Sequence, residues 1–319
     1  MSKLDPYIHL NFVQNPDGSI TRPLLPTMPA NPNPQPGELA ASKDITLNTN
    51  TKTWLRLHCP TNLATNDNKV ARLPIIIYVH HGSWVLLSAD SMVAHLAGNQ
   101  IANGVPAIIV SINYRLAPES RLPDQYDDII DAIYWIKQQS LDPNGEQWVR
   151  NYGDVSRCYL YGRGCGGNIV FFVALKALQL SLEPLKISGI IMNQPMFGGV
   201  QRTKSELRLA NDKILPLSML DMLWELALPK GVGRNHWYCN PIEDGPHKDQ
   251  IGGLSRSLVI GFGDDPMIDR QEEFVKMLVA CGVKVDAHFD DVGFHNIDLV
   301  DPRRTAAIRS IIDEFIYSF

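Results

Sequence analysis

A series of short apolar runs constrains the fold of this chain more than any other feature. The runs are rich in Ile, Val and Leu and cover residues 73–80, 107–114, 157–162, 187–194, 257–262 and 283–289. Continuous apolar runs of this length suit parallel strands that are covered on both faces. Helical patterns lie between them, as in residues 124–139, 167–180, 271–280 and 302–316. This alternation predicts an α/β fold with a mostly parallel central sheet flanked by helices, and an active site at the carboxyl ends of the strands.

Two segments depart from this alternation. Residues 1–65 crowd prolines between Pro23 and Pro36 and show almost no apolar period, which predicts an N-terminal arm or lid rather than a core element. Residues 200–240 separate two strands and are too long for a simple connection, so we expect a helical cap insertion there. We therefore expect residues 1–319 to form a single domain with an arm and a cap.

Composition narrows the classes of partner. The chain has 29 Lys and Arg against 34 Asp and Glu, a net charge of −5, which offers no basic surface for nucleic acid or an anionic membrane. No apolar run approaches the roughly 20 residues that span a bilayer, and the first residues do not resemble a signal peptide. We expect a cytoplasmic protein with a small-molecule substrate, and either a monomer or a homodimer fits.

The spacing of the five cysteines does not indicate disulfide bonds or a metal site. They are odd in number, scattered, and include no CxxC pair, which argues against a disulfide framework and against a zinc site. We expect reduced thiols, no metal and no cofactor.

Residues that could take part in catalysis lie at the ends of three predicted strands. Residues 78–84, YVHHGSW, end a strand in a turn of small residues, and residues 159–169, YLYGRGCGGNI, run from a strand through glycines toward a helix. The glycines do not fit the G-x-G-x-x-G spacing of a dinucleotide turn. Asp265 and His295 follow later strands, and the order turn, acid, histidine is that of the α/β-hydrolase catalytic triad.

These motifs resemble those of the plant carboxylesterases, in the hormone-sensitive-lipase-like branch of the α/β-hydrolases. Residues 78–84 resemble the HGGG oxyanion loop, residues 113–119 read NYRLAPE, and residues 162–168 are similar to GDSAGGN. The resemblance extends from Leu4 to Phe319, including SELRLAND at residues 205–212 and DPMID at residues 265–269. It implies an α/β-hydrolase fold without a cofactor.

The resemblance also implies roles for individual residues. Asp265 matches the triad acid and His295 the general base. The backbone N–H groups of Gly82, Ser83 and Cys165 match the oxyanion hole.

The chain departs from this family at the residue that would attack the substrate. Gly164 stands where the resemblance places the nucleophilic serine, Arg163 replaces an acid, and Cys165 replaces a small residue. His81 and Ser83 replace two glycines of the oxyanion loop. Because glycine tolerates the strained backbone of such a turn, we expect the turn to survive without its hydroxyl.

A base and an oxyanion hole without a nucleophile are suited to proton transfer rather than acyl transfer. We therefore predict a non-hydrolytic enzyme of plant specialised metabolism that cyclises, isomerises or eliminates from a small carbonyl-bearing metabolite; an alkaloid or a phenolic compound would fit. Dehydratases and cyclases of the same family use this scaffold without net hydrolysis. We expect Trp84 and Gly164 to border the substrate. For His81, a donor or base that reaches the substrate and a packing residue both remain open.

Two alternatives belong to other classes of function. One is a hormone-like receptor similar to the gibberellin receptors, although those proteins lose the histidine and keep the serine, the reverse of this chain. The other is a residual esterase that uses Cys165 or a water activated by His295. Cys165 follows the turn's apex, where the family directs the side chain elsewhere, so we interpret it as a buried packing residue.

Overall fold

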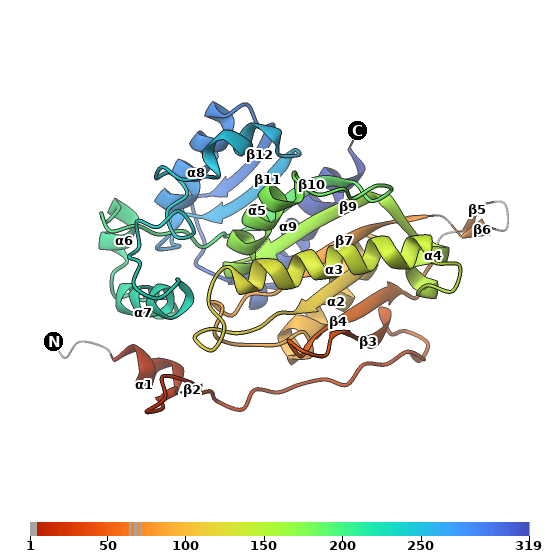
Figure 1. The fold of residues 1–319 in the computed structure, drawn as a ribbon, viewed down its shortest axis with the longest axis horizontal. Helices are drawn as coiled ribbons and strands as arrows, with labels where there is room; N and C mark the ends of the chain where they lie inside the picture. The colour runs from red at the N-terminus through yellow and green to blue at the C-terminus, as the bar shows by residue number, and fades with distance from the viewer. Residues whose placement is uncertain (1–4, 64, 67–68, 71, 319) are drawn as a thin grey trace.

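The computed structural model describes residues 5–63, 65–66, 69–70 and 72–318. Its centre is an eight-stranded sheet in the order β12-β11-β10-β9-β7-β8-β4-β3 (Figure 1). The strands from β12 to β8 pair in parallel. They are β7 (Leu73–Val79), β8 (Ile108–Asn113), β9 (Gly153–Arg163), β10 (Ile187–Asn193), β11 (Ser257–Phe262) and β12 (Val285–Asp290). The predicted mostly parallel sheet is confirmed, and each apolar run forms one of its strands.

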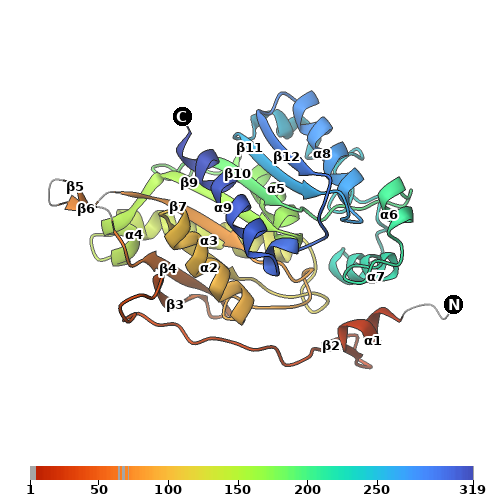
Figure 2. The ribbon, with the colours of Figure 1, turned by 180° about the vertical axis from the view of Figure 1, so that it is seen from behind.

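Helices cover both faces of this sheet, which is why its strands are apolar on both sides. One face carries α3 (Asp124–Leu141), α4 (Gln147–Tyr152), α5 (Cys165–Ala177) and α8 (Ile268–Ala280). The other carries α2 (Met92–Gly104) and α9 (Pro302–Tyr317), seen in front in Figure 2. Alternate residues of β7 pack on opposite faces, so that Ile75 and Ile77 join one apolar cluster while Ile76 and Tyr78 join the other.

The predicted arm over residues 1–65 is too long, because its second half belongs to the sheet. Strands β3 (Ala40–Asn48) and β4 (Thr53–Pro60) pair with each other and add to β8, all antiparallel. Leu55 and Leu57 of β4 are fully buried. The sequence TWLRLHCP alternates apolar with polar residues and lacks the continuous apolar run of the parallel strands. It therefore gave no strand signal, and the predicted arm was extended through it from the proline-rich segment.

The remaining arm runs along the outside of the molecule (Figure 1). It contains α1 (Pro6–Leu10) and a hairpin of β1 (Val13–Gln14) and β2 (Ile20–Thr21). A second hairpin, β5 (Thr65–Asn66) with β6 (Lys69–Val70), precedes β7. Residues 1–4 and 64 of the predicted arm, and Phe319 at the other terminus, lie outside the described residues.

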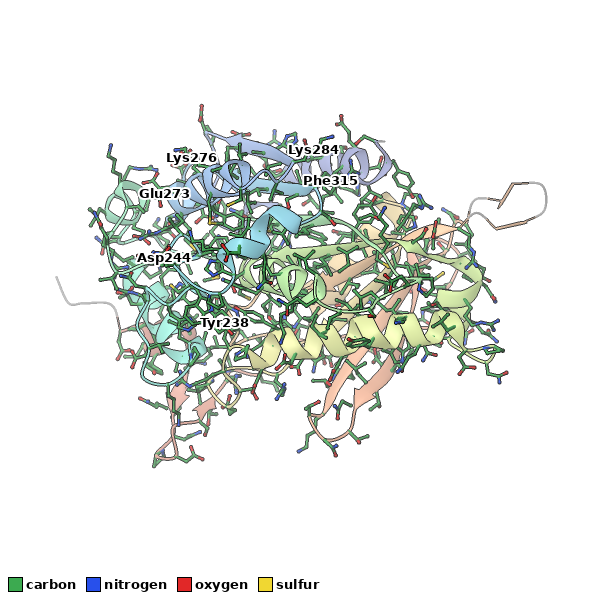
Figure 3. All side chains as sticks on the ribbon, turned by 45° about the horizontal axis from the view of Figure 1, so that its top comes forward. Tyr238, Asp244, Glu273, Lys276, Lys284 and Phe315 are labelled. Atoms are coloured by element: carbon green, nitrogen blue, oxygen red, sulfur yellow. The ribbon has the colours of Figure 1, made fainter. Side chains whose placement is uncertain are left out.

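The segment between β10 and β11 starts at the carboxyl end of β10, and its last part packs on α5 before β11 begins. It contains α6 (Lys204–Arg208), α7 (Leu217–Ala227) and the short helix η1 (Lys248–Gly253). Tyr238 (Figure 3) attaches the part of this segment after α7 to the rest of the protein. The Tyr238 ring packs against the Tyr126 ring with centroids 5.1 Å apart, and the Tyr238 carbonyl accepts a hydrogen bond from the Asn168 side chain at 2.7 Å. A last short helix, η2 (Ile297–Leu299), precedes α9. None of the described helices has the length and hydropathy needed to span a bilayer.

Helix α2 packs directly over a buried histidine of β4. A Cβ at Gly98 would lie 2.5 Å from His58 Nε2, and the His58 Nδ1 makes a 2.7 Å hydrogen bond to Asn99 Oδ1. Burial lowers the pKa of His58 from 6.5 to about 3, because the charged imidazolium loses its hydration.

This buried histidine predicts a pH-dependent stability. The unfolded chain takes up the His58 proton below pH 6.5 while the folded chain does not, so the free energy of unfolding should fall as the pH falls from 6.5 toward 3. The slope from one such proton is about 1.4 kcal/mol per pH unit. Urea unfolding across this range should show a shallower pH dependence for His58→Gln than for the native chain.

His288→Gln, at an exposed position of β12, serves as the matched control and should follow the native slope. A His58→Gln slope equal to the native one would show that His58 does not stay neutral in the folded state.

Candidate active site

The turn between β9 and α5 forms a sharp elbow around Gly164. Gly164 has φ 55° and ψ −120°, a backbone conformation that costs about 1–3 kcal/mol for a residue with a side chain. The flanking backbone segments touch, because a Cβ at Gly162 would lie 2.0 Å from Gly166 O and a Cβ at Gly166 would lie 2.2 Å from Val79 O. The elbow therefore has the strand, turn and helix context of the α/β-hydrolase nucleophile, with no side chain at its apex.

The apex has room for a side chain. A Cβ built on Gly164 would lie 3.5 Å from His81 Cβ, 3.7 Å from His295 Nε2 and 4.0 Å from Met196 Sδ. None of these is a clash, and an oxygen one bond further could reach the imidazole nitrogen. The predicted base therefore faces the place where the nucleophile would stand.

Asp265 holds His295 in that orientation. The His295 Nδ1 lies 2.8 Å from Asp265 Oδ2, and both side chains are buried. A proton on Nδ1 that is shared with the carboxylate leaves Nε2 unprotonated and directed at Gly164. The structure thus joins the acid and the base predicted from the sequence.

Two glutamines that the sequence analysis missed position the carboxylate. The side-chain amides of Gln194 and Gln271 each donate to Asp265 Oδ2 at 3.2 Å. Gln194 also accepts from the backbone N–H of Asn296 at 2.9 Å, which ties the acid to the loop that carries His295. Gln194 directly follows a buried strand, and this polar residue at a strand end is the signal that could have found it.

The loop after β7 that resembles the oxyanion loop passes beside the elbow, where the Trp84 N–H donates to Cys165 Sγ at 3.3 Å. Gly82, Ser83 and Trp84 have positive φ values of 121°, 54° and 64°. Within the described residues, the Gly82 N–H has no backbone acceptor. Cys165 is the first residue of α5, so its N–H has no partner inside the helix. The Ser83 hydroxyl contacts Met196 Sδ at 3.7 Å.

Cys165 directs its thiol into the protein, away from the apex. Its Sγ accepts from the Trp84 N–H at 3.3 Å and lies 3.6 Å from Tyr114 Oη. The residue is fully buried, and this burial raises the pKa of the thiol. A protonated, inward-facing thiol is a poor nucleophile, so Cys165 braces the oxyanion loop.

The two adjacent histidines differ in role. His80 is buried, its Nδ1 donates to the His81 carbonyl at 2.6 Å, and its ring stacks on Tyr114 with centroids 4.4 Å apart. Burial lowers the pKa of His80 to about 4. His81 borders the apex, and loss of hydration, followed by the neighbouring Arg163, His80 and His295, lowers its pKa well below 6.5. His81, whose Cβ would lie 3.5 Å from a Cβ at Gly164, is therefore neutral near pH 7.

Trp84 differs from its predicted place in the cleft wall. Its side chain is fully buried, and its ring packs on Trp224 of α7 with centroids 4.4 Å apart. It therefore joins the oxyanion loop to the cap and has no surface for a substrate in this structure. The sequence motif identified the loop but could not show which way this side chain turns.

The arm is fastened to the loops that shape the site. Arg22 donates from Nε to the carbonyl of Val85 and from Nη2 to that of Ala117, each at 2.6 Å, and it forms an ion pair with Glu119 of the NYRLAPE segment. One arm residue thus connects the oxyanion loop with the segment after β8.

Residues 76–299 match a family model described as alpha/beta hydrolase fold. The chain belongs to this family. It is 51% identical to probable carboxylesterase 9 of Arabidopsis thaliana, over 98% of this chain and 97% of that protein. It is 44% identical to 3-O-acetylpapaveroxine carboxylesterase CXE2 of Papaver somniferum, over 98% of this chain and 99% of that protein. These relatives place it among the carboxylesterase-like proteins of plants.

Two further comparisons bear on function and fold. Gibberellin receptor GID1C of Arabidopsis thaliana is 32% identical, over 86% of this chain and 80% of the receptor. A hyperthermophilic esterase from Pyrobaculum calidifontis has a similar structure, with a TM-score of 0.71 and 23% identity over 87% of this chain and 83% of that one. The fold is therefore that of known esterases. Within the described part of the chain, no group of three or more His, Cys, Asp or Glu side chains could hold a metal ion.

The geometry at the apex predicts that one substitution creates a working triad. In Gly164→Ser, the hydroxyl would face His295 Nε2, and we expect hydrolysis of p-nitrophenyl acetate to rise about a hundredfold or more over the native chain. The positive φ should lower stability by about 1–3 kcal/mol.

Gly164→Ala is the matched control, since it adds the same backbone strain without a hydroxyl. It should lose similar stability and gain no esterase activity. A native chain as active as Gly164→Ser would show that hydrolysis needs no residue at the apex.

Proposed function

We propose that this protein is a non-hydrolytic enzyme that uses His295 and a backbone oxyanion hole to move a proton on a small, mostly apolar, carbonyl-bearing metabolite. The observation that carries the proposal is the Nε2 of His295 facing an apex that has no nucleophile. A substrate carbon can occupy the space that a serine would fill. Isomerisation, elimination and cyclisation all begin with such a proton transfer.

Each part of the site has a role in this reaction. His295 Nε2 takes a proton from the carbon beside the carbonyl, while Asp265 holds the ring and stabilises the imidazolium. The electron pair of the broken C–H bond moves into the carbonyl, and the N–H groups of Gly82, Ser83 and Cys165 stabilise the resulting enolate oxygen. The proton then returns at another carbon, or a leaving group departs from the neighbouring one.

His81 gives the site a second proton carrier. Its Cβ would lie 3.5 Å from a Cβ at Gly164, and its lowered pKa keeps it neutral near pH 7. A neutral imidazole can accept a proton at one nitrogen and donate from the other. We propose that His81 returns the proton or protonates a leaving group.

The relatives support the class of substrate. Two of them are named as carboxylesterases, and an ester offers the same carbonyl group that an enolate forms from. We propose plant specialised metabolites as substrates because a relative from Papaver somniferum acts on 3-O-acetylpapaveroxine by its name.

Proton transfer can be measured without knowing the substrate. We expect the native protein, incubated in D₂O with a low-molecular-weight leaf extract, to incorporate deuterium into a carbonyl compound or to convert it, as followed by mass spectrometry. His295→Gln should lose at least about a hundredfold of this rate, since general bases contribute about that much.

His9→Gln, on the exposed helix α1, is the control and should keep the native rate. Equal exchange by the native chain and His295→Gln, or release of acids from esters at a rate that matches Gly164→Ser, would contradict the proposal.

The receptor relative favours one alternative, a hormone-like binding protein. This function predicts that a compound from the same extract is retained by the protein and recovered unchanged, with no deuterium incorporated. Retention without exchange would therefore select binding over catalysis.

A further inference from the structure

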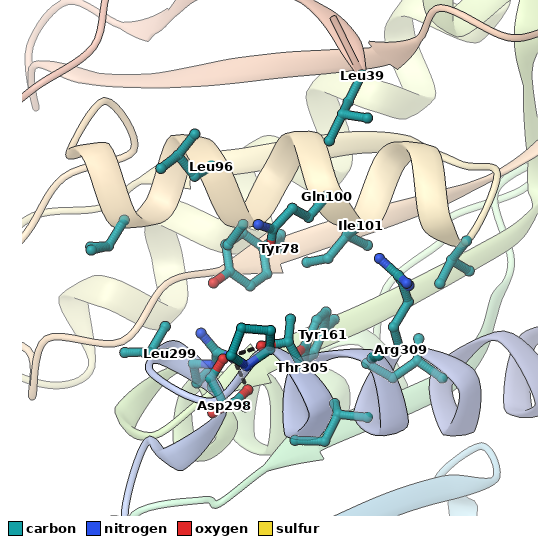
Figure 4. Close-up of a pocket in the computed structure, with 18 of the residues that line it drawn as sticks. Leu39, Tyr78, Leu96, Gln100, Ile101, Tyr161, Asp298, Leu299, Thr305 and Arg309 are labelled. Carbon is teal, nitrogen blue, oxygen red and sulfur yellow. Dashed lines mark hydrogen bonds and ion pairs between the residues drawn. The ribbon is translucent and has the colours of Figure 1, made fainter. Parts of the chain in front are cut away.

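A cavity of about 450 Å³ lies behind the sheet, between α2 and α9 and against β7 and β9 (Figure 4). Gly164, His81 and His295 are not among its lining residues, so it is separate from the candidate active site. Its volume falls within the range of small-molecule sites. The question is which kind of molecule its accessible surface would hold.

Arg309 is a charged side chain that solvent can reach in this cavity. It is partly exposed, and Figure 4 shows its guanidinium directed from α9 toward α2. A Cβ at Gly104, the last residue of α2, would clash with Arg309 Cδ, so the aliphatic stem is held against that helix end. The other two arginines of α9 pair with Asp301 and Asp290, whereas in the described part of the chain Arg309 has no ion pair. Its guanidinium is therefore available to an anion.

The other charges at the cavity do not compensate Arg309. Arg163 and Asp298 form a buried ion pair with each other, and the polar atoms of this pair lie beneath the wall, out of reach of a ligand. The carboxyl end of α2 carries about half an elementary negative charge, which helps to orient Arg309 and leaves part of its positive charge uncompensated. The accessible surface of the cavity is thus positive at this one place.

Apolar side chains form most of the rest of the accessible surface. Val300 keeps 70% of its surface exposed, and Leu39, Val93, Leu96 and Leu299 are each at least 37% exposed. Exposed apolar side chains gathered at one place indicate a binding surface. The cavity therefore combines an apolar wall with a single accessible cation.

We propose that this cavity binds a small amphipathic monocarboxylate. Its carboxylate pairs with the Arg309 guanidinium, and its apolar body covers Leu96, Ile101 and Ala306, which line the cavity. The planar guanidinium can donate two parallel hydrogen bonds to a carboxylate, while a cation would be repelled and a neutral molecule would gain the apolar contacts alone. This inference does not depend on the proposed function.

A pair of probes separates the carboxylate from the apolar body. 2-Naphthoate is an anion at neutral pH, and 2-naphthamide has nearly the same shape without the charge. We expect calorimetry to show that the native protein binds 2-naphthoate about tenfold more tightly than 2-naphthamide, a factor typical of a hydrogen bond to a charged group. Added salt should reduce this ratio, because a partly exposed ion pair is screened.

Arg309→Gln removes the charge and keeps the Cδ atom that packs against Gly104. We expect it to weaken 2-naphthoate binding about tenfold and to leave 2-naphthamide binding unchanged. Arg303→Gln is the matched control, since it lies on the same helix, its side chain is 93% exposed and it does not line the cavity. It changes the net charge equally and should keep the native affinity for both probes.

Filling the cavity locates the probe independently of Arg309. Ala306 lines the cavity on α9, whereas the next residue, Ala307, is exposed and does not. Ala306→Phe should abolish binding of both probes and Ala307→Phe should retain it, with melting temperatures measured to show that each variant is folded.

Four results would overturn the proposal. They are a native chain that binds 2-naphthoate no more tightly than 2-naphthamide, native affinity for 2-naphthoate in Arg309→Gln, an equal loss of affinity in Arg303→Gln, and native affinity in Ala306→Phe. The last result would place the probe elsewhere, the candidate active site included.

Discussion

The contact between the backbone of Gly166 and the end of β7 is the constraint around which the site is built. Because Gly162 and Gly166 lack side chains, β9 can enter α5 through a turn that a Cβ on either would block. This places the first N–H of α5 beside the oxyanion loop and Gly164 opposite His295. The geometry belongs to the backbone, so it persists without a nucleophile at the apex.

Much of the fold could be predicted because burial on both faces leaves a continuous apolar run, as in β7, β9 and β11. Strands β3 and β4 were missed because neither carries such a run: β3 is the edge strand, and β4, between β3 and β8, alternates apolar with polar residues. Asp265 and His295 could be predicted as acid and base because they follow the glycine-rich turn in the order of the family's motifs. The supporting glutamines and the inward turn of Trp84 depend on packing between loops, which leaves little trace in the local sequence.

Loss of hydration determines the protonation state of the histidines at the site. His80 and His81 are both kept neutral mainly by loss of hydration, while the buried pair of Arg163 and Asp298 supplies charge on the far side of the elbow. Arg163 directly precedes Gly164, so this ion pair anchors the end of β9.

The attachment of the arm through Arg22 has an evolutionary consequence. Besides the Glu119 side chain, the guanidinium holds backbone carbonyls of two loops, and backbone carbonyls exist whatever the loop sequence. The arm is therefore a module whose other residues can diverge while its anchor stays in place. Selection for a new substrate could act on this outer layer and leave the elbow, the acid and the base untouched.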